Sequence, residues 1–218
     1  MKIEANLQKD FQSVQRKLLM KKLTTTPGIW IDGKTYWIQN GYEKLIPEHS
    51  ISVHVKQIHK HSKIQYNEIY VRNHSTETKK MKILVLNYFT KAYQEHLSFV
   101  SPTENVIYHS IDDQLYLVNG KHETTSIEQR TVQPIWNVHT ELIWNNNHKG
   151  ILKYQPMAKG SSVSIFSLNM EVKPQSTGIS RAWSITGTEK KDILDLNHIH
   201  EKNVAEQNCI SVPSISAY

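Results

Sequence analysis

The segment from Met81 to Phe89 is apolar on both faces of an expected β-strand, and this feature constrains the fold most. It follows a shorter strand and a polar turn, so residues 68–90 predict a β-hairpin. Side chains alternate between the two faces of a strand. One face therefore carries Met81, Ile83, Val85 and Phe89, and the other carries Leu84, Leu86 and Tyr88. Such a strand must be covered on both sides, so we expect it at the centre of a sheet, between a second sheet and another element.

Turn signals divide residues 27–187 into about ten short strands, the pattern of an antiparallel β-sandwich or a partly open barrel. Asp32-Gly33 and Asn40-Gly41 are strong hairpin signals and predict a three-stranded meander over 29–46. Strands are also expected over 136–144, 162–173 and 178–187, with Ala182 and Trp183 on opposite faces of the last one. The predicted fold class is mainly β.

The hairpin over 69–89, with its Asn73-x-Ser75 turn, resembles hairpins of immunoglobulin-like sandwiches. The resemblance implies a two-sheet body and no particular functional residue. Residues 31–41 and 111–120 also echo each other in the order of their apolar and turn residues. The echo leaves two interpretations open: coincidence of common turn residues, or two related β units over about 28–105 and 106–187.

An amphipathic helix is expected at the start of the chain, within residues 1–26. Its apolar side chains lie along one narrow stripe, and its six basic residues outnumber Glu4 and Asp10. The stripe predicts packing on the protein's own sheet, a seam with another chain, or contact with a membrane surface. The candidate partner-binding residues are Leu7, Phe11, Val14 and Leu18.

Residues 188–218 predict a short helix, over 189–203, followed by a loose tail. Ile193, Leu196 and Ile199 are the apolar residues expected to anchor that helix.

The sequence contains no recognised catalytic motif, and we predict no catalytic residue, metal site or cofactor. Trp30 and Trp37 fall on one face of the expected meander, where they form either sandwich core or, with Tyr42, an aromatic platform for carbohydrate or another small ligand. The pairs His59-x-His61 and His198-x-His200 suggest a metal-dependent hydrolase as the weakest hypothesis, because neither pair has a nearby third ligand.

The formal net charge of +6 is concentrated in the first 23 residues, so we do not expect a nucleic-acid partner. The single cysteine and the polar start of the chain favour a cytoplasmic protein without a transmembrane segment. Assembly into a bacterial envelope or spore layer from inside the cell is compatible with that location. The leading hypothesis is a non-enzymatic structural or protein-interaction sandwich that binds a protein partner or its own copy; the alternative is a carbohydrate-binding module.

Overall fold

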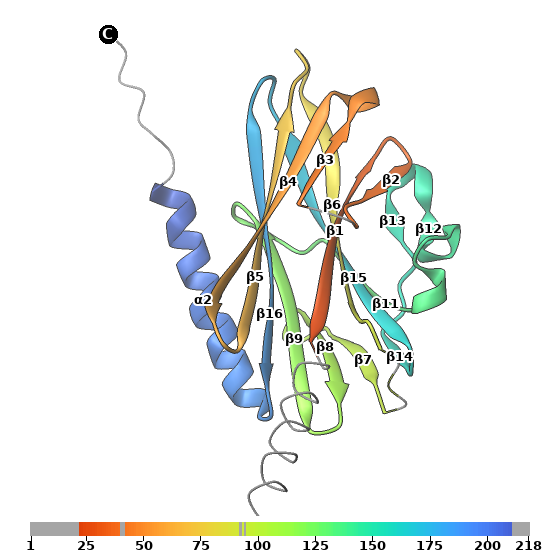
Figure 1. Ribbon diagram of the computed structural model, residues 1–218, viewed down its shortest axis with the longest axis vertical. Helices are drawn as coiled ribbons and strands as arrows, with labels where there is room; N and C mark the ends of the chain where they lie inside the picture. The colour runs from red at the N-terminus through yellow and green to blue at the C-terminus, as the bar shows by residue number, and fades with distance from the viewer. Residues whose placement is uncertain (1–21, 40–41, 92, 94, 211–218) are drawn as a thin grey trace, which may run out of the picture.

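The computed structural model describes residues 22–39, 42–91, 93 and 95–210, without the side chains of 59–61 and 206–210. Two antiparallel sheets pack face to face, and one helix lies against the outside of the larger sheet (Figure 1). The prediction of a mainly β, antiparallel, sandwich-like protein is confirmed. In the described part of the chain, no helix is both long and apolar enough to cross a membrane.

The smaller sheet has five strands in the order β11-β15-β6-β1-β2. All of its neighbouring strands are antiparallel. Its strands are β1 (Leu23–Ile31), β2 (Lys34–Trp37), β6 (Lys79–Phe89), β11 (Gln129–Pro134) and β15 (Ser162–Val172). The doubly apolar strand β6 is the central one, as the sequence predicts.

The larger sheet has nine strands in the order β14-β7-β8-β9-β16-β5-β4-β3, with β10 attached to β9. Its strands are β3 (Glu43–Ile46), β4 (Ile51–His61), β5 (Ile64–Asn73), β7 (Leu97–Ser101), β8 (Val106–Ile111), β9 (Gln114–His122), β10 (Thr125–Ser126), β14 (Met157–Lys159) and β16 (Thr177–Gly187). The turn η1 (Pro47–His49) joins β3 to β4. Ala182 packs between the sheets and Trp183 on the outside, which confirms their predicted opposite faces.

Both faces of β6 are buried, with the predicted division of side chains. Met81, Ile83, Val85 and Phe89 lie in the core between the two sheets. Leu84 and Leu86 lie on the outer face of the smaller sheet, where Tyr88 is half-buried. The sandwich therefore has a third apolar layer outside the smaller sheet.

Residues 135–155, which we name the cover segment, form that third layer. The segment consists of η2 (Ile135–Asn137), η3 (Glu141–Ile143), β12 (Trp144–Asn146), η4 (Asn147–Lys149), β13 (Ile151–Leu152) and the residues that join them. Val138, Ile143, Trp144 and Leu152 pack on Leu84 and Leu86. The cover segment is therefore the element that buries Leu84 and Leu86 on the outer side of the smaller sheet.

The expected strand over 136–144 is also wrong, because the chain forms two short 3-10 turns there. Pro134 ends β11, and Ile135–Asn137 then turns away from the sheet. The Thr140 hydroxyl accepts a hydrogen bond from the Leu142 backbone N–H, which caps the second turn. Local capping thus overrides the strand propensity of Trp136, Val138 and Ile143.

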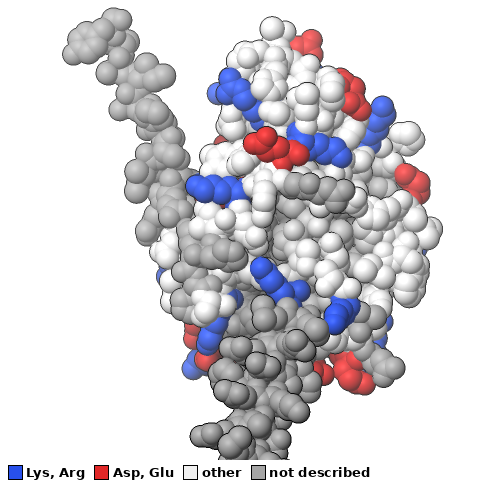
Figure 2. All heavy atoms as spheres, viewed as in Figure 1, with Lys and Arg blue, Asp and Glu red and all other residues white. Residues whose placement is uncertain are grey.

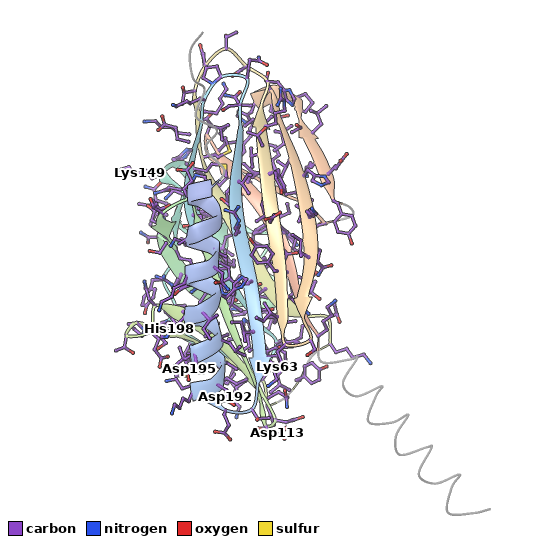
Figure 3. All side chains as sticks on the ribbon, turned by 90° about the vertical axis from the view of Figure 1, so that its left-hand side faces the viewer. Lys63, Asp113, Lys149, Asp192, Asp195 and His198 are labelled. Atoms are coloured by element: carbon purple, nitrogen blue, oxygen red, sulfur yellow. The ribbon has the colours of Figure 1, made fainter. Side chains whose placement is uncertain are left out.

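The helix α2 (Lys190–Ile210) packs on the outer face of the larger sheet, along β16 and β9. Figure 3 shows it lying along the sheet, with Asp192, Asp195 and His198 labelled on its exposed part. Its buried stripe is Ile193, Asn197, His200 and Val204. The prediction of a helix here is confirmed, but the helix continues to Ile210, through residues that were expected to belong to a loose tail. The expected anchor Ile199 is 57% exposed, and two polar residues occupy the inner face.

The structure corrects two predictions near the N-terminus. The expected helix lies mostly in residues 1–21, outside the described residues, but β1 already begins at Leu23, so residues 23–26 belong to the sheet. The predicted hairpin at Asp32-Gly33 is confirmed, since β1 pairs with β2 around it. The third strand of the expected meander over 29–46 is wrong, because β3 pairs with β4 in the larger sheet rather than with β2. This crossing places Ile46 in the core between the sheets.

The two proposed β units do not form separate bodies. β6 pairs with β1 and with β15, while β16 pairs with β5 and with β9. Each sheet therefore combines strands from residues 28–105 and 106–187. The duplication itself stays a prediction.

Candidate functional site

A cleft of about 510 Å³ lies between the β1–β2 hairpin and the cover segment. Trp37 and Trp144 contribute aromatic rings to it, and polar side chains surround them. The polar lining residues are Lys34, Thr35, Tyr36, Glu48, His139, Thr140, Glu141 and Asn147. Aromatic rings beside several hydrogen-bonding groups are typical of a small-ligand site.

Trp37 is positioned by a glycine on the neighbouring strand and by a histidine of the cover segment. A Cβ atom added to Gly28, its partner in β1, would lie 2.6 Å from the Trp37 ring, so the ring requires glycine there. The His139 ring meets the Trp37 ring edge to face at a centroid distance of 6.2 Å. His139 Nε2 also lies 3.0 Å from Gln39 Nε2, which connects the cover segment to the chain after β2.

The rim of the cleft carries a hydrogen-bonded tyrosine and carboxylate. The Tyr36 hydroxyl donates to Glu48 Oε1 at 2.8 Å and lies 3.3 Å from His49 Nε2. Burial and the bond to Glu48 raise the pKa of Tyr36 to about 12. Tyr36 is therefore a neutral donor at physiological pH, and Glu48 supplies the negative charge at this rim.

Trp30, the second predicted ligand-binding residue, anchors the cover segment instead of lining this cleft. Its Nε1–H points at Asn147, with the backbone oxygen at 3.0 Å and Oδ1 at 3.1 Å. Its ring contacts Gly150 closely, since an added Cβ there would lie 2.9 Å from the indole carbons. The packing interpretation therefore describes Trp30 better than the platform interpretation.

Tyr42 lies in a different place. It is 61% exposed and lines a second cleft of about 420 Å³, between β1 and the strands β4 and β5. The structure therefore does not bring Trp30, Trp37 and Tyr42 together in one cleft.

The other candidate residues give no assembled site in the described part of the chain. Leu7, Phe11, Val14 and Leu18 lie outside the described residues, as do the side chains of His59 and His61. His198 is exposed on α2 and His200 is buried, because residues two apart on a helix face different sides. Among the described residues, no three His, Cys, Asp or Glu side chains could hold a metal ion together.

A buried histidine pair between the two sheets was not expected. The rings of His96 and His109 stack at a centroid distance of 5.2 Å, with His96 Nε2 3.0 Å from His109 Nδ1. Ser98 Oγ lies 2.9 Å from both of these nitrogens, and Ser164 Oγ lies 2.8 Å from His109 Nε2. Burial lowers the pKa of His96 to about 4 and that of His109 well below its ordinary value.

The serine–histidine contacts of this pair have the distances of a nucleophile and its base. Both histidines and Ser98 are at most 2% exposed, however, so a substrate could not reach the hydroxyl. The pair is a polar contact that joins β7 and β8 of the larger sheet to β15 of the smaller sheet.

The cover segment exposes large apolar side chains to solvent. Of the nine exposed large hydrophobic residues in the described part of the chain, five lie within residues 135–155. Trp136 is 70% exposed and the preceding Ile135 is 39% exposed, both in η2. Leu142, in η3, a turn that contacts η2, is 55% exposed. We name these three residues the Trp136 surface. The sequence pattern did not reveal it because the pattern over 136–144 predicts a strand. The available signal was a tryptophan two residues after Pro134, which breaks helices and strands.

The charged side chains give no comparable concentration on the face shown in Figure 2, where acidic residues lie among lysines and arginines over the described elements. The chain matches no protein-family model, and the search of curated proteins found no significant relative. The arguments about function therefore depend on the residues and geometry described above.

Proposed function

We propose that this chain is a non-enzymatic interaction protein that associates with a second copy of itself through the Trp136 surface. The observation that carries the proposal is the 70% exposure of Trp136 on a segment whose Ile143, Trp144 and Leu152 are buried. Tryptophan is among the residues that contribute most to the free energy of protein–protein binding, because it buries a large apolar area in a rigid side chain. A folded protein gains nothing for its own stability by leaving such a ring in water.

The composition of the surface favours a second copy as the partner. Ile135, Trp136 and Leu142 carry no charge. A two-fold interface brings the same patch of both subunits together, so an uncharged apolar patch is complementary to itself. The neighbouring residues Asn137 and Thr140 add polar groups for a rim.

The N-terminal stripe of Leu7, Phe11, Val14 and Leu18 is the second element of this proposal, as an additional seam between copies. In this proposal the sandwich, as in immunoglobulin-like proteins, is the rigid body that presents both surfaces. The association takes place in the cytoplasm, and a cell-envelope or spore layer is one assembly that it could build.

Light scattering after gel filtration tests the proposal on the full chain. The wild-type protein is expected to be a dimer or larger at micromolar concentration, and Trp136→Ser with Leu142→Ser to be a monomer with an unchanged circular dichroism spectrum. Leu45→Ser is the matched control, because Leu45 is 64% exposed on β3, in the larger sheet.

A paired variant, Leu7→Ser with Phe11→Ser, separates the two seams. If it dissociates the oligomer while the Trp136 variants do not, the N-terminal stripe and not the Trp136 surface makes the contact. A wild-type monomer throughout the concentration range would refute the self-association proposal for both surfaces.

The cleft at Trp37 favours a second candidate function, the binding of a carbohydrate. Its volume of about 510 Å³ suits a small saccharide, whose C–H faces stack on aromatic rings while its hydroxyls bond to groups such as Tyr36 and His139. Tryptophan fluorescence against a panel of oligosaccharides tests it, with Tyr36→Phe and His139→Ala as variants that keep both tryptophans. Unchanged fluorescence across the panel would refute it.

A further inference from the structure

A third hollow, a groove of about 620 Å³, lies on the side of the sandwich where β11 forms the edge of the smaller sheet. One wall is the turn that follows β7, with Pro102 and Asn105, and the other is the end of the cover segment, with Leu152 and Tyr154. Arg130, near the start of β11, lines the groove between them. The arrangement that requires explanation is a single guanidinium group in a groove that has apolar side chains along its walls.

Arg130 lacks the partners that a desolvated arginine ordinarily has. It lies directly opposite Phe166 in the pairing of β11 with β15, so its side chain shares the inner face of the sheet with that buried ring. Its Nε and Nη2 atoms are buried and have no hydrogen-bond partner among the described residues. Burial alone lowers the pKa of Arg130, and no neighbouring charge contributes to the shift.

The carboxylates close to the groove are already bound to other cations. Glu128, which also lines the groove, accepts a hydrogen bond from Lys82 Nζ at 2.8 Å. Glu104 lies 2.7 Å from Lys190 Nζ and accepts a hydrogen bond from the Ser101 hydroxyl at 2.8 Å. A desolvated charge that is not paired is strongly unfavourable. An anionic group of a ligand would supply the partner that Arg130 lacks in the described part of the protein.

We propose that this groove binds a carboxylate group that is attached to an apolar body, with Arg130 as the residue that pairs with the carboxylate. A guanidinium group has the planar geometry that matches a carboxylate, and the pair strengthens where water is excluded. The apolar body lies against Leu152 and the ring of Tyr154. The site lies apart from the Trp136 surface and does not depend on the proposed self-association.

The charge around the groove selects a carboxylate over a phosphate group. Among the described residues that line it, Arg130 is the cation and Glu128 the carboxylate. A single positive charge balances a monoanion, whereas a phosphate dianion would keep excess negative charge near Glu128. Both a free carboxylic acid and an acidic side chain of a peptide provide this chemistry.

Nuclear magnetic resonance of the Arg130 Nε–H group in the full chain tests the proposal. One arm uses 3-phenylpropionate against its neutral amide, and the other uses the acidic dipeptide N-acetyl-Phe-Glu-amide against N-acetyl-Phe-Gln-amide. The acid is expected to shift the Arg130 signal in a saturable way, with at least about tenfold weaker binding of the matched amide. Saturation by 3-phenylpropionate identifies a free acid as ligand, and saturation only by the dipeptide identifies a peptide.

The variant Arg130→Met separates binding from folding. It keeps an apolar side chain of similar length and removes the unpaired charge, so it is expected to melt at a higher temperature and to lose acid binding at least about tenfold. Arg72→Met, at an exposed position on β5, is the control and is expected to change neither property. Equal affinity for acids and amides, no saturable shift with either acid, or a lower melting temperature for Arg130→Met would overturn the proposal.

Discussion

The two outer faces of the sandwich are covered in contrasting ways. On the larger sheet, α2 places Asn197 so that its Oδ1 accepts from Trp183 Nε1 at 2.9 Å, and Glu201 accepts from Asn119 at 2.7 Å. His200 meets the Trp183 ring edge to face at 5.0 Å. The helix therefore satisfies the polar groups and hides the aromatic rings beneath it.

The cover segment on the smaller sheet combines burial with exposure. Ile143 is 2% exposed and Trp144 is 9% exposed, whereas the adjacent Leu142 is 55% exposed. Trp30 holds the segment by its bonds to Asn147. The segment that carries the exposed residues is therefore fixed to β1. The difference is that α2 buries the residues on which it packs, whereas the cover segment buries some apolar side chains and leaves others in water, where we propose that binding occurs.

The largest effect is expected from removing the ring under α2. Trp183→Ala should lower the free energy of unfolding by about 3–5 kcal/mol, because it leaves a cavity and also leaves Asn197 without its indole donor. Urea denaturation measures the loss. Ile199→Ala, at a position of α2 that is 57% exposed, is the control and should cost less than about 0.5 kcal/mol. Equal costs for the two variants would remove the structural role assigned to α2.

Acid is expected to weaken the contact between the sheets before it loosens α2. The pKa of His96 is about 4 in the folded protein and about 6.5 in an unfolded chain. Between these values the unfolded chain binds a proton that the folded protein does not. Stability is therefore full above about pH 6.5 and falls as the pH drops towards 4, by roughly 3 kcal/mol for His96 alone.

Denaturation by urea at a series of pH values measures that slope. His96→Gln should flatten it, whereas the exposed His198→Gln should leave it unchanged. Hydrogen exchange near pH 5 should rise in β7 and β15, which the histidine pair joins, before it rises in α2. Simultaneous loosening of both regions would contradict the placement of the acid-sensitive contact.

The parts of this arrangement that the sequence predicts are those governed by local alternation. Residues 81–89 and 178–187 alternate over whole strands, so their faces and the opposite placement of Ala182 and Trp183 follow from the pattern alone. Alternation did not predict the cover segment, because capping by Thr140 and the end of the strand at Pro134 determine its path. Strand propensity indicated the wrong structure there.

Long-range pairing explains the remaining misses. The stacking of His96 on His109 and the isolation of Arg130 depend on which strands become neighbours, and no local pattern states that order. The same limit applies to β3, whose partner is β4 and not β2. Of the residues predicted for ligand binding, Trp37 alone lines the cleft at the cover segment, and Trp30 is required to hold that segment.

A smaller effect tests whether the cover segment is fixed by Trp30. Gly150 has a φ of +60°, and an added Cβ would lie 2.9 Å from the Trp30 ring. Gly150→Ala should cost about 2 kcal/mol, from backbone strain and the displacement of the ring. Gly160→Ala is the matched control, since its φ is +82° and nothing lies within 4 Å of the added atom. Its cost should be about 1 kcal/mol, from strain alone.

If both glycine variants lower the free energy of unfolding equally in urea denaturation, Trp30 does not constrain the cover segment. The exposed residues of that segment would then not be held in place by β1. Near-ultraviolet circular dichroism provides a second measurement, because only the displacement of an indole ring should change the aromatic signal. That signal should change for Gly150→Ala and remain unchanged for Gly160→Ala.

The smallest effect on stability is expected at the most exposed ring. Trp136→Ala should change the free energy of unfolding by less than about 0.5 kcal/mol at concentrations where the protein is monomeric, because 70% of the side chain is already in water. Ile143→Ala, seven residues along the same segment, should cost about 2–5 kcal/mol, since Ile143 packs on the outer face of β6. A loss above about 1 kcal/mol for Trp136→Ala would mean that its ring stabilises the monomer, and the cover segment would then resemble α2 instead of differing from it.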